Sequence, residues 1–255
     1  MFRTRASAAS GPSRTPPYAV ASKQPLHILT FLLPLVIAYE IGLAVLLRGS
    51  EGVLTNKAHE TLLLFFNIFG INDKGGLYLG GAALVTVLLV WHLLNRDPWR
   101  IDPTTPAIMA IESLLLAIPL IVLGLLMADR QALSAVAAGT AEEALAGAGI
   151  WSGVAISIGA GLYEELLFRM LLIAVLHTLL VDVAKISSVL GAGIAVLVSA
   201  AAFCWYHLPP HAQAALFYLV AGLYFGAVYV TRGFGIVVGV HAFYDIVVLQ
   251  FQFAS

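Results

Sequence analysis

Hydrophobic residues occur along this chain in runs that are long enough to cross a lipid bilayer. A spanning helix needs about 20 mainly apolar residues, because the hydrocarbon core is about 30 Å thick. Apolar runs separated by short polar segments predict seven transmembrane helices, within a range of six to eight. The expected fold is therefore all-α, a polytopic membrane helical bundle. The approximate bounds of the predicted spans are 26–47, 77–95, 106–128, 150–180, 187–207, 212–230 and 234–252.

Three other segments do not fit a span. Residues 58–70 are apolar but too short to cross, so we expect an interfacial or re-entrant segment. Residues 131–148 are rich in Ala and contain Glu142 and Glu143, which predicts an amphipathic helix on the surface. Residues 1–25 hold Arg and Lys but no acid, and they lack an apolar centre. This composition favours a disordered cytoplasmic tail over the alternative, an organelle transit peptide.

The chain therefore divides into three parts. Residues 1–25 form the predicted tail, residues 26–149 form N-terminal membrane helices of unassigned role, and residues 150–252 form a helical core that carries the candidate chemistry. The tail and the loops predicted on its side of the membrane carry more Lys and Arg than the opposite loops. The positive-inside rule then predicts a cytoplasmic N-terminus. We expect a multi-pass protein of the inner (cytoplasmic) membrane.

The composition excludes several other classes of protein. Hydrophobic residues make up 60% of the 255 residues and charged residues 11%, whereas soluble domains have roughly 45–50% and 25%. The net charge of −1 provides no basic surface for nucleic acid. The single cysteine, Cys204, excludes a disulfide framework, a Cys-based zinc site and an iron–sulfur cluster.

Three of the predicted spans contain ionisable side chains, where lipid-facing charges are unfavourable. Each charged group costs roughly 2.5–3.5 kcal/mol at a helix centre on insertion scales. A membrane helix keeps such groups when they pair, face water or perform chemistry. The groups are Glu164, Glu165 and Arg169 in span 150–180, His207 at the end of span 187–207, and His241 and Asp245 in span 234–252.

Local pairing explains some of these groups but not all. Glu165 and Arg169 are four positions apart and can form an intrahelical ion pair, and His241 and Asp245 have the same spacing. Glu164 lies about 100° around the helix from Glu165 and has no local cationic partner. A purely structural interpretation therefore leaves the Glu164 carboxylate unexplained.

A buried reaction centre explains the groups together. The imidazoles of His207 and His241 and the carboxylate of Asp245 supply the nitrogen and oxygen ligands that suit a divalent ion such as zinc. Glu164 can then act as general base on a water molecule, activated by the ion or by the histidines alone. This arrangement is what hydrolysis inside a membrane requires, because the attacking water must be held in apolar surroundings.

These residues also resemble the motifs of the CPBP intramembrane proteases, which include the CAAX prenyl proteases and the bacteriocin-processing or Abi proteins. The family pattern is EExxxR, then FxxxH, then HxxxN or HxxxD. Each element is common alone, but their order and shared location in spans make the combination specific. The resemblance covers about residues 150–250. The matching elements are Glu164-Glu165-Leu-Leu-Phe-Arg169, Phe203-Cys-Trp-Tyr-His207 and His241-Ala-Phe-Tyr-Asp245.

The resemblance implies peptide-bond hydrolysis within the membrane, on a membrane-anchored or lipidated peptide or protein substrate. It implies that Glu164 is the base and that His207 assists it. His241 and Asp245 would complete the site as metal ligands or as oxyanion stabilisers. The candidate catalytic residues are Glu164, Glu165, Arg169, His207, His241 and Asp245, and the candidate metal ligands are His207, His241 and Asp245.

The chain departs from the family at one position. Asp245 stands where the family often has Asn, and its negative charge favours a cation over an oxyanion. We therefore expect a divalent metal, zinc, at the site. Glu165 and Arg169 would orient the site and neutralise its charge.

Two other functions remain open on the sequence alone. One is a catalytically idle scaffold or immunity-type protein, and the other is a proton- or ion-coupled transporter that uses the same buried acids and histidines. The intact motifs, Glu164 above all, argue against the idle scaffold. The absence of a visible inverted repeat argues against the transporter.

The predicted topology restricts the depths at which His207 and His241 can lie in the membrane. Alternating spans place His207 at the outer end of one span and His241 in the inner part of another. Their depths agree only if span 187–207 ends inside the protein or span 234–252 begins well below the surface. We therefore expect tilted, unequal helices around a water-filled cavity. We also expect Glu164, His207 and His241 to lie within about 12 Å of one another.

Overall fold

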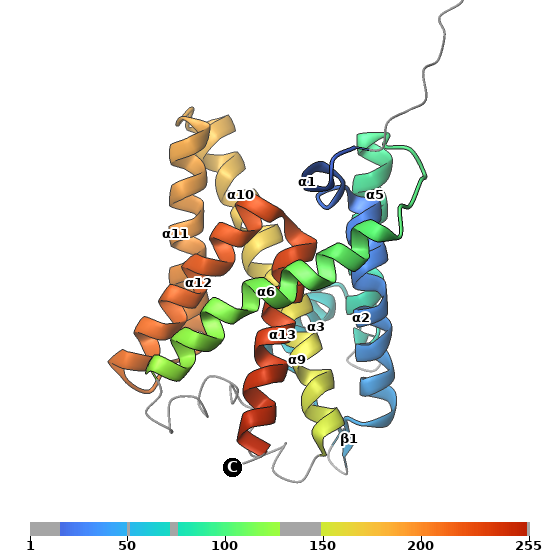
Figure 1. Cartoon of the computed structure of the whole chain (residues 1–255), viewed down its shortest axis with the longest axis vertical. Helices are drawn as coiled ribbons and strands as arrows, with labels where there is room; N and C mark the ends of the chain where they lie inside the picture. The colour runs from blue at the N-terminus through green and yellow to red at the C-terminus, as the bar shows by residue number, and fades with distance from the viewer. Residues whose placement is uncertain (1–15, 50–51, 72–75, 128–148, 254–255) are drawn as a thin grey trace, which may run out of the picture.

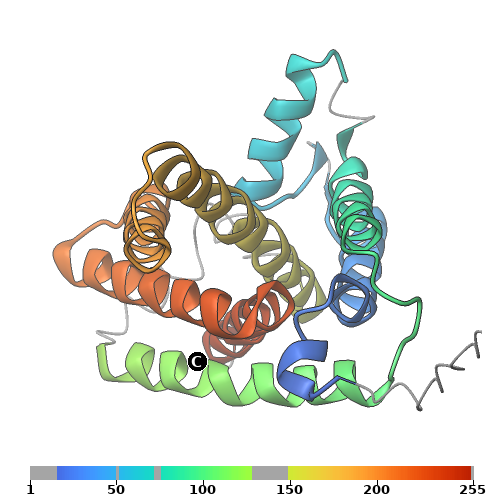
Figure 2. The same ribbon diagram turned by 90° about the horizontal axis from the view of Figure 1, so that it is seen from above.

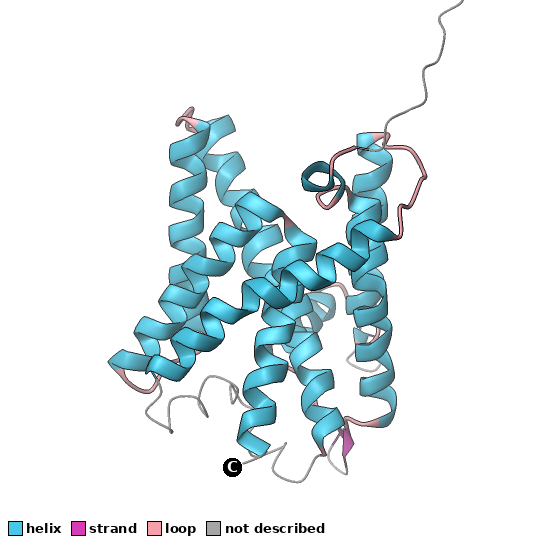
Figure 3. Ribbon diagram, in the orientation of Figure 1, coloured by secondary structure: helices cyan, strands magenta, loops and turns pink. Residues whose placement is uncertain are grey.

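The computed structural model describes residues 16–49, 52–71, 76–127 and 149–253. Within these ranges the chain is helical apart from a minimal antiparallel pair of strands, β1 (Arg48–Gly49) and β2 (Gly52–Val53), as Figure 3 shows. The helices are α1 (Tyr18–Ala21), α2 (Pro25–Val45), α3 (Lys57–Ile68), α5 (Leu79–Asn95), α6 (Thr104–Met127), α9 (Ile150–Glu165), α10 (Ile173–His177), α11 (Ser188–Tyr206), α12 (Ala212–Arg232) and α13 (Phe234–Phe253). The expected all-α polytopic bundle is confirmed.

Each of the seven predicted spans corresponds to a helix, although the helices differ in length. Five are long and apolar enough to cross a membrane: Pro25–Val45, Thr104–Met127, Ile150–Val183, Ser188–Tyr206 and Ala212–Arg232. Leu79–Asn95 and Phe234–Leu249 are shorter apolar helices. The unequal lengths agree with the prediction of unequal helices.

The remaining segments have different outcomes. The short apolar run at 58–70 is helix α3, whereas residues 131–148 lie outside the described residues. The predicted tail ends earlier than residue 25, because α1 is helical and packs on the bundle. Tyr18 donates a hydrogen bond to Glu112 of α6, which also forms an ion pair with Arg232. These contacts explain why a segment without an apolar run is nonetheless ordered.

Helix α13 lies at the centre of the bundle, between α9 and α6 (Figures 1 and 2). Its close approach to α9 depends on Gly161, where an added Cβ would lie 2.8 Å from the backbone nitrogen of Ala242. Helix α6 crosses the outside of the bundle obliquely over α12 and α13. The two helices that carry the predicted acids and the second histidine are therefore in direct contact.

Helix α13 begins inside the protein. Gly233 alone connects it to α12, and its φ of 94° is a conformation that favours glycine. Phe234 is 1% exposed and Ile236 is fully buried, so the first turn of α13 is covered by protein. The sequence predicted that His207 and His241 lie at the same depth if span 234–252 begins below the membrane surface. A first turn that is covered by protein is compatible with that expectation.

The α11–α12 pair is held by small residues. An added Cβ on Gly222 would lie 2.9 Å from Ala200 Cα, and one on Gly226 would lie 2.7 Å from a Val196 methyl carbon. Both neighbours are on α11, so these glycines allow two helices of one chain to approach closely. The end of α11 at Tyr206 precedes Pro209 and Pro210, which cannot continue a helix.

Candidate active site

Helix α9 and its continuation provide the acid pair and the arginine. The helix passes at Glu165 into a π-helical segment, Leu166–Leu172, that contains Arg169. Such local widening of an α-helix is frequent at functional sites. Glu164 is 6% exposed, and Glu165 and Arg169 are fully buried, so the three ionisable groups lie inside the protein and not against lipid.

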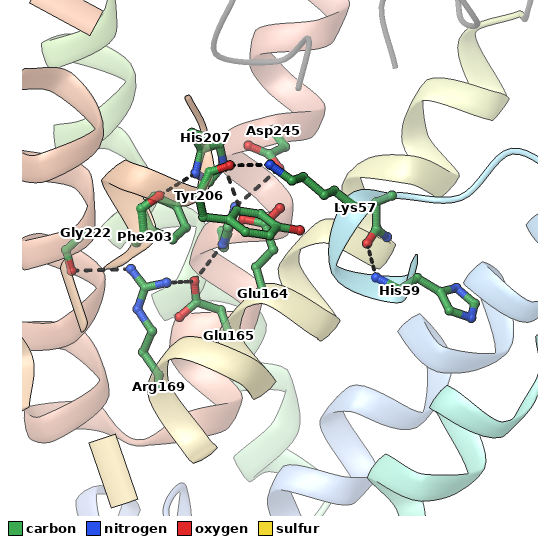
Figure 4. A network of polar contacts seen from close by, with 12 residues as sticks. Lys57, His59, Glu164, Glu165, Arg169, Phe203, Tyr206, His207, Gly222 and Asp245 are labelled. Atoms are coloured by element: carbon green, nitrogen blue, oxygen red, sulfur yellow. Dashed lines mark hydrogen bonds and ion pairs between the residues drawn. The ribbon is translucent and has the colours of Figure 1, made fainter. Parts of the chain in front are cut away.

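Glu165 forms the inner part of the site (Figure 4). Its Oε1 lies 3.0 Å from Arg169 Nη1, which confirms the predicted intrahelical pair. The same oxygen lies 2.7 Å from His241 Nδ1. Arg169 also donates to the carbonyl of Gly222 at 3.3 Å, and its guanidinium lies 4.3 Å from the centre of the Phe203 ring. Glu165 therefore links α9 to α13, and Arg169 links the same region to α11 and α12.

Glu164 faces both histidines. Its Oε2 lies 3.5 Å from His207 Nε2 and 3.9 Å from His241 Nε2. The same nitrogen of His241, Nε2, also lies 3.4 Å from Asp245 Oδ2. The groups come from α9, from the residue that follows α11, and from α13. The predicted convergence of Glu164, His207 and His241 is therefore confirmed, at distances well inside the stated 12 Å.

Hydrogen bonding fixes which nitrogen of His207 carries the proton. Its Nδ1 lies 2.8 Å from the carbonyl of Phe203, and a carbonyl only accepts, so Nδ1 donates. Burial lowers the pKa of His207, which follows the last residue of α11. The imidazole is thus neutral, with the lone pair of Nε2 directed toward Glu164.

Aromatic rings hold both imidazoles in place. The ring of His241 stacks on Phe225, with centroids 4.6 Å apart and an interplanar angle of 14°. The ring of His207 stacks on Tyr218 at 4.3 Å and 23°. Phe203 lies 4.4 Å from His207 and 5.9 Å from His241, measured between centroids. The Phe of the FxxxH motif therefore packs near both imidazole rings.

The site opens into a cavity of about 180 Å³. Its walls are mainly apolar and come from α9, α11, α12 and α13, and they bring together Glu164, His207, His241 and Asp245. Asn56 and Lys57, at the start of α3, also line it. Neither residue is marked by a sequence pattern, because both lie next to a run too short to be a span and belong to no motif.

The donor set fits a metal in its chemistry. Each imidazole has Nδ1 engaged, by Phe203 in one case and Glu165 in the other, and presents Nε2 to the cavity; metal-bound histidines commonly have this arrangement. Among the residues that the structure describes, however, no three His, Cys, Asp or Glu side chains are grouped closely enough to hold a metal ion. The zinc site at His207, His241 and Asp245 stays a prediction.

The fold and site define a polytopic helical membrane protein with carboxylates and imidazoles around a partly open cavity. Residues 146–247 match the family model of the Rce1-like type II CAAX prenyl endopeptidases. The match contains all six candidate catalytic residues and confirms, for this segment, the resemblance inferred from the motifs. It supports an intramembrane endopeptidase in general. No curated protein and no solved structure matches the chain.

Proposed function

We propose that the protein is an intramembrane endopeptidase that hydrolyses a peptide bond of a membrane-anchored or lipidated substrate, with a water molecule activated by Glu164. The observation that carries this proposal is the approach of Glu164 Oε2 to two imidazole nitrogens, at 3.5 and 3.9 Å, in one cavity. The match of residues 146–247 to a family of prenyl endopeptidases supports the choice of a lipidated peptide as substrate.

The proposed reaction begins with a water molecule between Glu164 and His207. Both Glu164 Oε2 and the neutral Nε2 of His207 are acceptors, so a water can donate one hydrogen to each. Glu164 takes a proton as the water oxygen attacks the peptide carbonyl carbon, and it then returns that proton to the departing amine. A positioned general base of this kind contributes about 10²–10⁴-fold to the rate.

His241 completes the proposed site. Its Nδ1 donates to Glu165 and its Nε2 faces both Glu164 and Asp245, so a proton on Nε2 would place positive charge beside the developing oxyanion. In the metal-assisted form of the proposal, Nε2 of His207, Nε2 of His241 and Asp245 would hold a divalent ion, which would supply Lewis-acid activation of the water. Glu164 keeps the role of base in both forms.

The test uses purified protein in proteoliposomes and a panel of prenylated and otherwise membrane-anchored peptides. We expect Glu164→Gln to lower kcat by about 10²–10⁴-fold, because the amide cannot accept the proton of the water. Glu60→Gln is the matched control, since Glu60 is exposed on α3 and does not line the cavity. Cleavage that survives Glu164→Gln at the wild-type rate would contradict the proposal.

A further inference from the structure

Helix α3 begins with a lysine that contacts the end of α11. Lys57 is the first residue of α3, and its ammonium donates a hydrogen bond to the carbonyl of Tyr206 at 2.6 Å. The nitrogen also lies 4.4 Å from the centre of the Tyr206 ring. Figure 4 shows the side chain extending from α3 toward Tyr206 and His207. Lys57 therefore connects a helix outside the matched segment to the residue that precedes His207.

This contact is part of a cap on the last turn of α11. The final carbonyls of an α-helix lack helical partners and need other donors. The carbonyl of Phe203 accepts from His207 Nδ1 at 2.8 Å, and the carbonyl of Tyr206 accepts from Lys57. The ring of Tyr206 also lies edge-on to the imidazole of His207, with centroids 5.4 Å apart. The position of this imidazole therefore depends on a helix end to which Lys57 supplies a donor from another helix.

The start of α3 is itself anchored beside Glu164. His59 of α3 is fully buried and packs on Tyr163 of α9, the residue before Glu164, with ring centroids 5.0 Å apart. Its Nδ1 lies 2.8 Å from the hydroxyl oxygen of Tyr39 on α2. Asn56 caps α3 by accepting from the backbone N–H of His59 at 2.8 Å. These contacts fix the start of α3 to α2 and α9.

Helix α3 therefore bridges the two residues that share the attacking water in the proposed reaction. One end of the bridge packs on Tyr163, which precedes Glu164, and the other end contacts Tyr206. Glu164 Oε2 lies 3.5 Å from His207 Nε2 between these two ends. Lys57 takes part in none of the ion pairs between described residues, so no carboxylate among them competes with the carbonyl of Tyr206 for its ammonium.

We propose that Lys57 is a positioning residue that acts through the end of α11 and holds His207 at the distance from Glu164 that the shared water requires. This inference rests on the proposed function and adds to it a residue from outside the matched segment. Lys57 itself performs no chemistry in this reaction. Without its ammonium the last turn of α11 opens more often, and Nε2 of His207 no longer stays in reach of the water held by Glu164.

The first test is a kinetic comparison in proteoliposomes with one membrane-anchored peptide that the wild type cleaves. We expect Lys57→Met to lower kcat by about 10–100-fold and to leave KM nearly unchanged, because a catalytic group displaced by about 1 Å loses rate and not substrate affinity. We expect Lys57→Arg to retain most of the activity, because a guanidinium also donates to a carbonyl. Lys185→Met, at an exposed position, is the matched control.

A double-mutant cycle shows whether Lys57 acts through His207. In a His207→Ala background the imidazole that Lys57 positions is absent, so Lys57→Met should cause no further loss of kcat. A lysine that contacts the substrate directly, or that supports the fold in general, would lower the rate in both backgrounds by the same factor. All four proteins are assayed at a temperature below the onset of unfolding of each.

A labelling measurement requires no cleavage. Cys204, the single cysteine of the chain, lies in the last turn of α11, three residues before His207. Its Sγ donates to the carbonyl of Ala215 at 3.3 Å, so the thiol is engaged while this turn is ordered. We expect a maleimide to modify Cys204 several-fold faster in Lys57→Met than in the wild type, because the helix end opens more often. Lys57→Arg and Lys185→Met should react at the wild-type rate.

Several results would overturn the inference. Wild-type kcat in Lys57→Met would do so, and so would a further loss of kcat when Lys57→Met is added to His207→Ala. A rise in KM at constant kcat would assign Lys57 to substrate binding instead. Equal labelling of Cys204 in the wild type and Lys57→Met would show that the lysine does not order the end of α11. If the wild type cleaves no peptide, the proposed function fails, and the labelling comparison alone decides whether Lys57 orders this helix end.

Discussion

His241 Nδ1 lies 2.7 Å from Glu165 Oε1, although the two residues are 76 positions apart in the chain. The same carboxylate oxygen lies 3.0 Å from Arg169 Nη1, and neither Glu165 nor Arg169 is exposed. Glu165 therefore serves an ion pair with Arg169 of the π-helical segment that follows α9, and a contact with α13. The orientation of the second imidazole depends on this carboxylate, while the adjacent Glu164 is left to face the cavity.

We expect Glu165→Gln to lower the free energy of unfolding by about 3–5 kcal/mol, because it leaves the buried Arg169 without its carboxylate partner. Unfolding of the purified protein in detergent, followed by circular dichroism, measures the change. Glu60→Gln serves as the control, since Glu60 is exposed. A variant as stable as the wild type would show that Arg169 finds its compensation elsewhere.

Zinc gives a second prediction. We expect purified protein to contain zinc, a chelator to abolish cleavage, and added zinc to restore it, because the two free Nε2 atoms and Asp245 are suitable ligands. Asp245→Asn is expected to lower the zinc content, since it removes an anionic ligand. Metal analysis of both proteins, with Glu60→Gln as control, provides the measurement. Full activity in the absence of bound metal would contradict the metal-assisted form of the mechanism and support the metal-free form.

The contact between α9 and α13 is sensitive to small changes in volume. We expect Gly161→Ala to destabilise the protein by about 1–3 kcal/mol, because its Cβ would lie 2.8 Å from the backbone of Ala242. Cleavage should fall with it, since Ala242 is adjacent to His241. Gly193→Ala is the matched control, because an added Cβ there meets nothing within 4 Å. Thermal unfolding and cleavage assays on both variants test this, and equal behaviour of the two would contradict it.

Much of the fold followed from the spacing of apolar residues. The seven apolar runs are helices, because positions that face lipid and positions that face the protein interior both favour apolar side chains. The order of α1 was missed, since it depends on a bond between Tyr18 and Glu112 that are 94 positions apart. Hydrophobic periodicity carries no information on such a contact.

The site was predictable where its residues occur in short motifs. Glu164 stood out because it had no local partner, and its approach to His207 at 3.5 Å explains why a charged group is kept in that span. Lys57 could not be found in this way. It lies 149 positions from Tyr206, whose carbonyl it contacts, and a lysine at the start of a short helix is normally an ordinary solvated residue.

The cavity is lined by residues from two separate parts of the chain, one inside and one outside the segment that matches the family model. The six candidate catalytic residues all lie in residues 146–247, whereas Asn56 and Lys57, which line the same cavity, come from the N-terminal half of the chain. Substitutions around the start of α3 can therefore change the shape and charge of this cavity while every candidate catalytic residue is retained.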